Sequence, residues 1–165
     1  MLIAHYTLLI TFIFSFALSS LLSAEINDRV VAFADNTAVT LSEFEEAYSK
    51  ALKATPEITK DEVLNAMINR ILLLKEAKKI RLEAATEDEL LKEYVDLRIM
   101  PFIKIKEAAA LDFYQKNKEN FQGKTFETVR EEIENYLNEA ELNRLLKAHI
   151  EELRKKAYIK IQLNN

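Results

Sequence analysis

The sequence predicts a mostly α-helical domain with a long C-terminal helix and a small β-sheet that joins strands from the two ends of the domain. Three observations predict this fold. The 165 residues include only one glycine and two prolines, which favours long helices over a turn-rich β fold. Apolar residues recur every three or four positions from residue 126 to 156, which is the period of a helix. Short apolar and β-branched runs typical of strands occur near both ends, within residues 30–39 and 157–163.

Residues 1–24 form a segment apart from this domain. They contain no Lys, Arg, Asp or Glu, and residues 8–18 are almost wholly apolar. This pattern predicts a secretory signal peptide cleaved near Ala24, which leaves residues 25–165 as a single helical domain. Because the segment lacks a positively charged start and has the bulky Leu22 just before the cleavage site, an uncleaved membrane anchor is the alternative.

The first strands and helices follow from short local signals. The run from Val30 to Ala34 predicts a strand, and Asp35-Asn36 predicts a turn from which residues 37–39 return as a hairpin. Each of the next three helices begins with a capping box, in which a Thr is followed three residues later by a Glu. The three pairs are Thr40 with Glu43, Thr59 with Glu62, and Thr86 with Glu89. These helices are expected to end near Pro56, Ile80 and Pro101.

The long helix is predicted from Phe126 to Lys156, with Thr125 at its N-cap and the other helices around it. It would span about 45 Å at about 1.5 Å per residue. Its first half is rich in Glu and its last turn is basic, an order that suits the helix dipole. A shorter helix is expected before it, at about residues 106–117. The strand predicted within residues 157–163 needs a partner, because its backbone groups cannot be buried unpaired. We therefore expect it to meet the N-terminal hairpin.

Composition excludes several functions. Evenly mixed charges with a formal net charge of −4 argue against nucleic acid as a partner, since a basic stripe is expected there. The absence of cysteine excludes disulfides and thiolate metal sites, and a single glycine leaves no phosphate-cradling loop. Beyond residue 24 the sole histidine is His149, which is expected to be partly packed or solvated on the long helix rather than a catalytic base. The sequence thus predicts no catalytic residue, no cofactor, no metal and no enzymatic activity.

A binding function would instead use apolar surface. Flexible Met and amphipathic Tyr side chains adapt to many partners, and a groove between helices is the expected place for them. For any single position the core is the favoured alternative, because periodic apolar residues usually pack inside. Residues 100–103 are the exception, because a proline interrupts the helical period there. The candidate binding residues are Met67, Tyr94, Met100, Phe102, Ile103, Phe113 and Tyr114.

Four segments of the chain resemble, in the same order, segments of the SurA-type periplasmic chaperone family. Residues 30–44 are similar to the family's opening strand, turn, Val-Thr pair and helix. Residues 65–77 are similar to its second helix, where an apolar run precedes Glu-Ala. Residues 113–121 look like its segment with Tyr, Lys-Asn and Phe, and residues 151–161 are similar to its closing helix and strand. Together these segments cover most of residues 29–163.

The chain departs from the family at two places. Asn36-Thr37 stands where the family has a glycine turn, which leaves the geometry of the hairpin open. The family commonly carries a parvulin prolyl-isomerase domain before its final helix, whereas only four residues separate Phe121 from Phe126 here. The resemblance therefore implies the chaperone module without the isomerase, and residual prolyl-isomerase activity is disfavoured.

The resemblance implies an ATP-independent holdase of the periplasm that captures extended apolar segments of unfolded or nascent envelope proteins, including outer-membrane proteins. Such a protein would contact a membrane only through residues 1–24, if this segment is not cleaved. A second hypothesis is a non-catalytic interaction or assembly subunit of the cell envelope, for example a homodimer that swaps terminal helices or strands. The two differ in their partners, because a holdase binds many unfolded proteins weakly and a subunit binds one native protein tightly.

Overall fold

The computed structural model of the protein describes residues 28–163. The predicted signal peptide, residues 1–24, lies outside this range. No helix within the described range is both long enough and apolar enough to cross a membrane.

The described chain is mostly helical, as predicted, and its long C-terminal helix has the predicted bounds. Its helices are α2 (Leu41–Ala54), α3 (Lys60–Lys79), α4 (Glu87–Arg98), η2 (Met100–Phe102), α5 (Glu107–Lys116), η3 (Lys118–Phe121) and α6 (Phe126–Lys156), where η marks a short 3₁₀ helix. All three predicted capping boxes are present. The side chains of Thr40, Thr59 and Thr86 each accept a hydrogen bond from the third amide of the helix, and the carboxylate of the Glu at that third position accepts one from the backbone amide of the Thr. Thr125 stands at the N-cap of α6, but its hydroxyl bonds the hydroxyl of Thr128 instead of a backbone amide.

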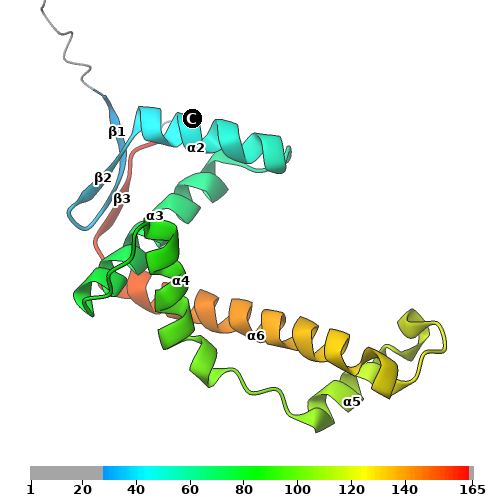
Figure 1. Ribbon diagram of the computed structural model, residues 1–165. Coiled ribbons are helices and arrows are strands. Elements are labelled where there is room, and N and C mark those ends of the chain that lie inside the picture. Colours follow the sequence, from blue (N-terminus) through cyan, green and yellow to red (C-terminus); the bar gives the residue numbers. More distant parts are fainter. Residues whose placement is uncertain (1–27, 164–165) are drawn as a thin grey trace, which may run out of the picture.

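The two ends of the described chain meet in one antiparallel sheet, which confirms the sequence prediction. Strand β1 (Val30–Ala34) lies between β2 (Thr37–Thr40) and the terminal strand β3 (Ile159–Ile161), so the strand order is β2-β1-β3 (Figure 1). Ala34 pairs with Thr37 across the turn of the hairpin and with Ile159 on β3. The turn needs no glycine, because Asp35 itself adopts a left-handed conformation with φ of 51°.

Asp35 joins this turn to the rest of the fold. Its carboxylate accepts a hydrogen bond from the backbone amide of Tyr158 at 2.9 Å and from Nζ of Lys75 on α3 at 2.6 Å. Its own amide donates to the carbonyl of Tyr158 at 2.7 Å. The bond from Lys75 and the bond from the Tyr158 amide together hold the pKa of Asp35 below its usual value.

We expect Asp35→Ala to lower the free energy of unfolding by about 1–3 kcal/mol, because it leaves the Tyr158 amide without its acceptor and places alanine in a left-handed conformation. Asp35→Asn is the matched control, since Asn tolerates this conformation and keeps an acceptor while losing the charge. Because the folded-state pKa of Asp35 is depressed, its charge contributes stability above the unfolded pKa, and this contribution is lost as the pH falls through the folded pKa. Urea unfolding at neutral and acidic pH measures both effects. An equal acid loss in wild type and Asp35→Asn would contradict this role of the charge.

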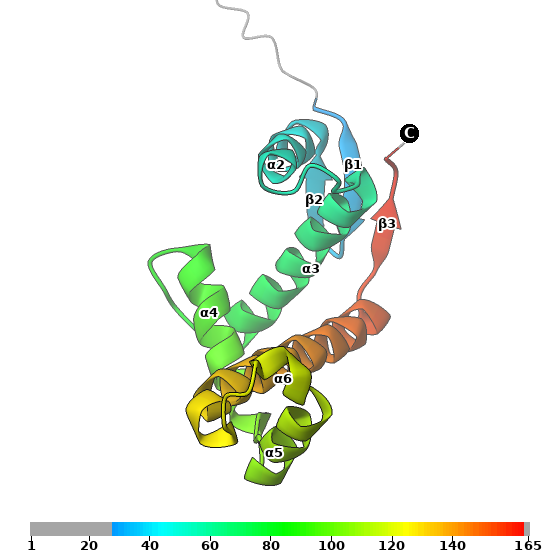
Figure 2. The ribbon, with the colours of Figure 1, turned by 90° about the vertical axis from the view of Figure 1, so that its right-hand side faces the viewer.

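The buried residues form three separate clusters spread along α6, and the other helices do not surround α6 as the sequence analysis expected. The first cluster lies between the sheet, α2 and α3. The second joins the end of α3 to α4 and is covered by Leu146 and Ile150 of α6. The third consists of Ala110 on α5 with Val129 and Ile133 on α6. The fold is therefore elongated along α6 (Figure 1), and α6 connects α5 at one end with the sheet at the other (Figure 2).

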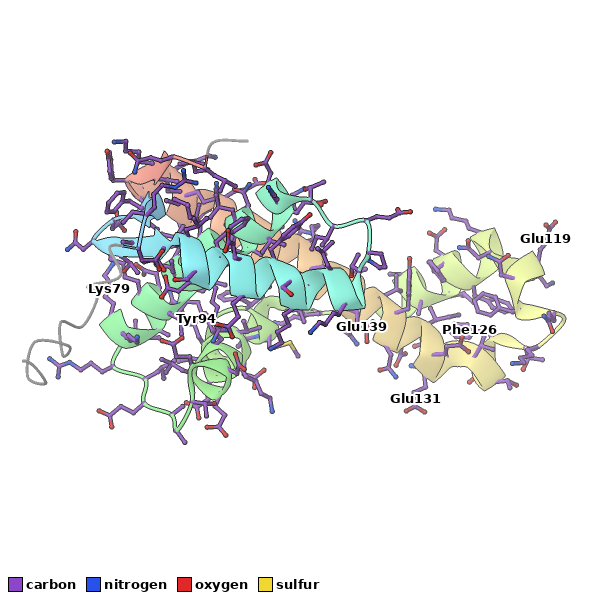
Figure 3. All side chains as sticks on the ribbon, turned by 90° about the horizontal axis from the view of Figure 1, so that it is seen from above. Lys79, Tyr94, Glu119, Phe126, Glu131 and Glu139 are labelled. Carbon is purple, nitrogen blue, oxygen red and sulfur yellow. The ribbon has the colours of Figure 1, made fainter. Side chains whose placement is uncertain are left out.

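The third cluster forms a projecting arm, defined here as α5, η3 and residues 126–140 of α6. Figure 3 shows Glu119, Phe126 and Glu131 on this arm, well away from Tyr94 in the body of the molecule. At the other end, α6 is fastened to α3 by Arg154, whose guanidinium donates to the side-chain oxygens of Asn69 at 2.7 Å and Asn65 at 2.8 Å. One half of α6 thus belongs to the body and the other half to the arm.

Candidate binding surface

The structure places the seven candidate residues at four different sites, so they do not line one groove. Met100, Phe102 and Ile103 lie in and just after η2, Tyr94 is inside the second cluster, Phe113 and Tyr114 belong to the arm, and Met67 lies on α3. Exposure decides which of these sites is available to a partner.

The segment around η2 carries the most exposed apolar side chains among the candidates. Helix α4 ends at Arg98, and Pro101 lies in the first turn of η2, where it cannot donate a backbone hydrogen bond. The short helix closes with the amide of Ile103 bonded to the carbonyl of Met100 at 3.0 Å. Met100 is 44% exposed and Phe102 is 71% exposed, whereas Ile103 is half-buried. The interruption that marked this segment in the sequence therefore does produce exposed apolar surface.

Leu97 adds to this surface and was not among the candidates. At helical spacing it lies on the same side of α4 as Leu90 and Tyr94. Leu90 and Tyr94 are buried, but Leu97 is 55% exposed. The second cluster covers only the first turns of α4, and the last turn extends beyond it. We call Leu97, Met100 and Phe102 the apolar patch; charged and exposed Asp96, Arg98 and Lys104 flank it in the sequence.

Tyr94 is not a surface residue, which corrects its prediction as a binding residue. Its side chain is 1% exposed and packs with Leu73, Leu74 and Ala77 of α3. Its hydroxyl is 2.7 Å from Nε2 of His149 on α6. An amphipathic Tyr on a helix is equally suited to a groove or to a core with one polar partner, and here the partner lies 55 positions away in the sequence.

Phe113 and Tyr114 are half-buried and hold the arm together. The ring of Phe113 lies 5.1 Å from that of Tyr136 on α6. The ring of Tyr114 contacts those of Phe121 and Phe126 at 5.4 and 5.7 Å, and its hydroxyl donates to the carbonyl of Lys124 at 2.7 Å. These contacts fold the chain back from α5 to α6, so the structure assigns both residues a packing role within the arm.

Met67 lines a separate cavity of about 580 Å³ between β2, α3 and the start of α4. Its apolar lining includes Val39, Ile71 and Leu74, and none of the patch residues reaches it. The charges at its rim are paired with one another or with neighbours: Arg70 with Asp88 at 2.7 Å, Lys75 with Asp35 at 2.6 Å and Lys78 with Glu87 at 3.5 Å. Met67 is thus half-buried at a separate cavity whose lining is partly apolar and partly charged.

Comparisons with protein-family models, with curated proteins and with solved structures find no match for this chain. Within residues 28–163, no group of three or more His, Cys, Asp or Glu side chains is placed to hold a metal ion. Among the seven candidate residues, the two most exposed, Met100 and Phe102, belong to the apolar patch at the junction of body and arm.

Proposed function

We propose that this protein is an ATP-independent holdase of the periplasm that captures unfolded or nascent envelope proteins, outer-membrane proteins among them. The observation that supports it best is the apolar patch, three large apolar side chains close together in the sequence that are 44–71% exposed. Exposed apolar side chains gathered in one segment are typical of an interaction surface. The predicted export segment and the resemblance of four segments to SurA-type chaperones support the choice of compartment and client.

The chemistry of the patch suits many clients better than one. Leu97, Met100 and Phe102 present no hydrogen-bonding group, so they recognise apolar area and no particular side-chain pattern, and Met adapts its shape to different partners. Burying the exposed parts of three such side chains supplies about 3–5 kcal/mol before the costs of association. That is a weak interaction, as a holdase that releases its client without ATP requires.

The position of the patch supports the same function. Helix η2 and residues 103–106 run between the body and the base of the arm (Figure 1), so a client bound at the patch would lie beside both. An extended client segment is long enough to contact several such surfaces at once, because a strand spans about 3.3 Å per residue. Several weak contacts on one chain raise the overall affinity without a tight site.

Light scattering tests the proposal directly. A chemically unfolded outer-membrane protein is diluted into buffer with and without the purified protein, in the absence of nucleotide. We expect suppression of aggregation at near-stoichiometric ratios. No suppression at several-fold excess would overturn general chaperoning, and tight binding to a single native envelope protein would then indicate the alternative, a dedicated assembly subunit.

A further inference from the structure

The joint between α4 and α6 contains a partly buried polar contact that the proposed function does not use. The hydroxyl of Tyr94 and Nε2 of His149 are 2.7 Å apart, and their rings lie 5.8 Å apart at an interplanar angle of 34°. Around them pack apolar side chains of three helices, among them Leu90 on α4, Leu73 on α3 and Ile150 on α6. Within the described chain this contact is a polar link between α4 and α6 inside an apolar cluster.

The surroundings indicate which atom carries the proton. Burial and the charge of Glu76 raise the pKa of Tyr94 above its ordinary value, and the charge of Arg98, one turn later on α4, opposes them without reversing the direction. The phenol therefore keeps its proton, and its O–H can donate to Nε2 of His149, 2.7 Å away. Nε2 can accept only while the imidazole is neutral, with its proton on Nδ1.

We propose that the Tyr94–His149 hydrogen bond is an acid-sensitive latch, which holds α4 on α6 while His149 is neutral and releases α4 when His149 is protonated. Protonation converts Nε2 from an acceptor to a donor, so the bond donated by the Tyr94 hydroxyl is lost unless the phenol turns to accept, and a partly buried cation appears near Arg98. Both changes oppose the closed joint.

The charges that face His149 come from all three helices and largely balance. Glu152 and Lys156 lie on α6, Arg98 on α4 and Glu76 on α3; the two carboxylates raise the pKa of His149 and the two cations lower it. Burial has the largest effect and brings the pKa below its ordinary value. The open form therefore binds a proton more readily than the closed form, so the closed joint loses stability as the pH falls below about 6.5 and further through the lowered pKa.

Release of α4 would have a defined result. The N-terminal turn of α4 stays tied to α3 by the pairs of Arg70 with Asp88 and with Glu87, while its C-terminal turn carries Leu97 and leads into η2. Opening at the C-terminal end would uncover Tyr94 next to the apolar patch. If the protein is the proposed holdase, and this step rests on that function, acid would enlarge its client-binding surface.

Amide hydrogen exchange of the purified protein tests the latch without any client. Protection factors, which remove the intrinsic pH dependence of exchange, are compared at about pH 7.5 and about pH 5. We expect the protection of α4 amides to fall over this range, because the open form binds a proton more readily than the closed form. The protection factors of the β1 and β2 amides should change much less than those of α4. Unchanged protection of α4 would overturn the proposal.

Two variants separate the latch from general acid destabilisation. His149→Gln keeps a neutral acceptor for Tyr94 at every pH, so α4 protection should be high and independent of pH. Tyr94→Phe removes the bond but keeps the ring, so α4 should be less protected already at neutral pH. An equal acid loss in wild type and His149→Gln would overturn the latch. Opening of α4 without any suppression of client aggregation would leave the latch in place and exclude the proposed function.

Discussion

The double variant Met100→Ser with Phe102→Ser is expected to need roughly ten times more protein than wild type for the same suppression of client aggregation. These two side chains are 44% and 71% exposed, and the part of each that a client can cover contributes about 1 kcal/mol or more to binding. Losing about 2 kcal/mol in total corresponds to more than a tenfold loss of affinity. The folded state should be nearly unaffected, because substitution of exposed side chains usually changes stability by about 0.5 kcal/mol or less.

The matched control is Ile80→Ser with Tyr158→Ser. These side chains are 39% and 63% exposed, but Ile80 follows α3 and Tyr158 precedes β3, so the control removes comparable apolar surface from elsewhere. Light scattering across a range of protein ratios, with thermal melts of all variants, measures the effect. If both double variants lose activity equally, apolar surface in general acts on the client and the patch has no special role.

Ile133→Ala is expected to unfold the arm while the body stays folded. Ile133 is 1% exposed and is one of only three buried residues in the arm's cluster, with Ala110 and Val129. Truncating a buried Ile to Ala costs about 2–5 kcal/mol, which is a large share of what so small a cluster supplies. Because the arm shares no buried cluster with the sheet, its unfolding need not spread there.

The comparison variant is Ile68→Ala, which removes a fully buried side chain from the cluster of the sheet and α3. Limited proteolysis and site-resolved hydrogen exchange should show residues 107–140 opened in Ile133→Ala and the sheet opened in Ile68→Ala. A single cooperative transition, in which arm and sheet are lost together in both variants, would show that the clusters are coupled along α6 and would contradict the prediction.

Most of the secondary structure could be predicted because its signals are local. A capping box needs only hydrogen bonds between two residues three positions apart. Thr40, Thr59 and Thr86 therefore mark helix starts independently of the rest of the chain. The change from helical to alternating period after Lys156 likewise depends only on neighbouring residues. Even the meeting of the two chain ends followed from a general requirement, the pairing of strand backbone groups.

The candidate surface was predicted only in part, because exposure depends on where other elements lie. Met100 and Phe102 were found from the proline that interrupts the helical period, and they are exposed. Tyr94 was chosen as an amphipathic candidate but is buried, whereas Leu97, on the same side of α4, was not chosen and is exposed. The exposure of each residue depends on how much of α4 the second cluster covers, and the sequence of α4 alone does not determine that.

The sequence by itself determined the elements of this protein, because helix caps, turns and hydrophobic periods act over a few residues. Only the tertiary structure decided that the core divides into three clusters along α6, since that division depends on which helix packs against which part of its length. It also decided that Tyr94 meets His149 across 55 positions and that the last turn of α4 stays uncovered. Long-range packing joins residues that share no local pattern, so the patch and the latch appear only in the folded chain.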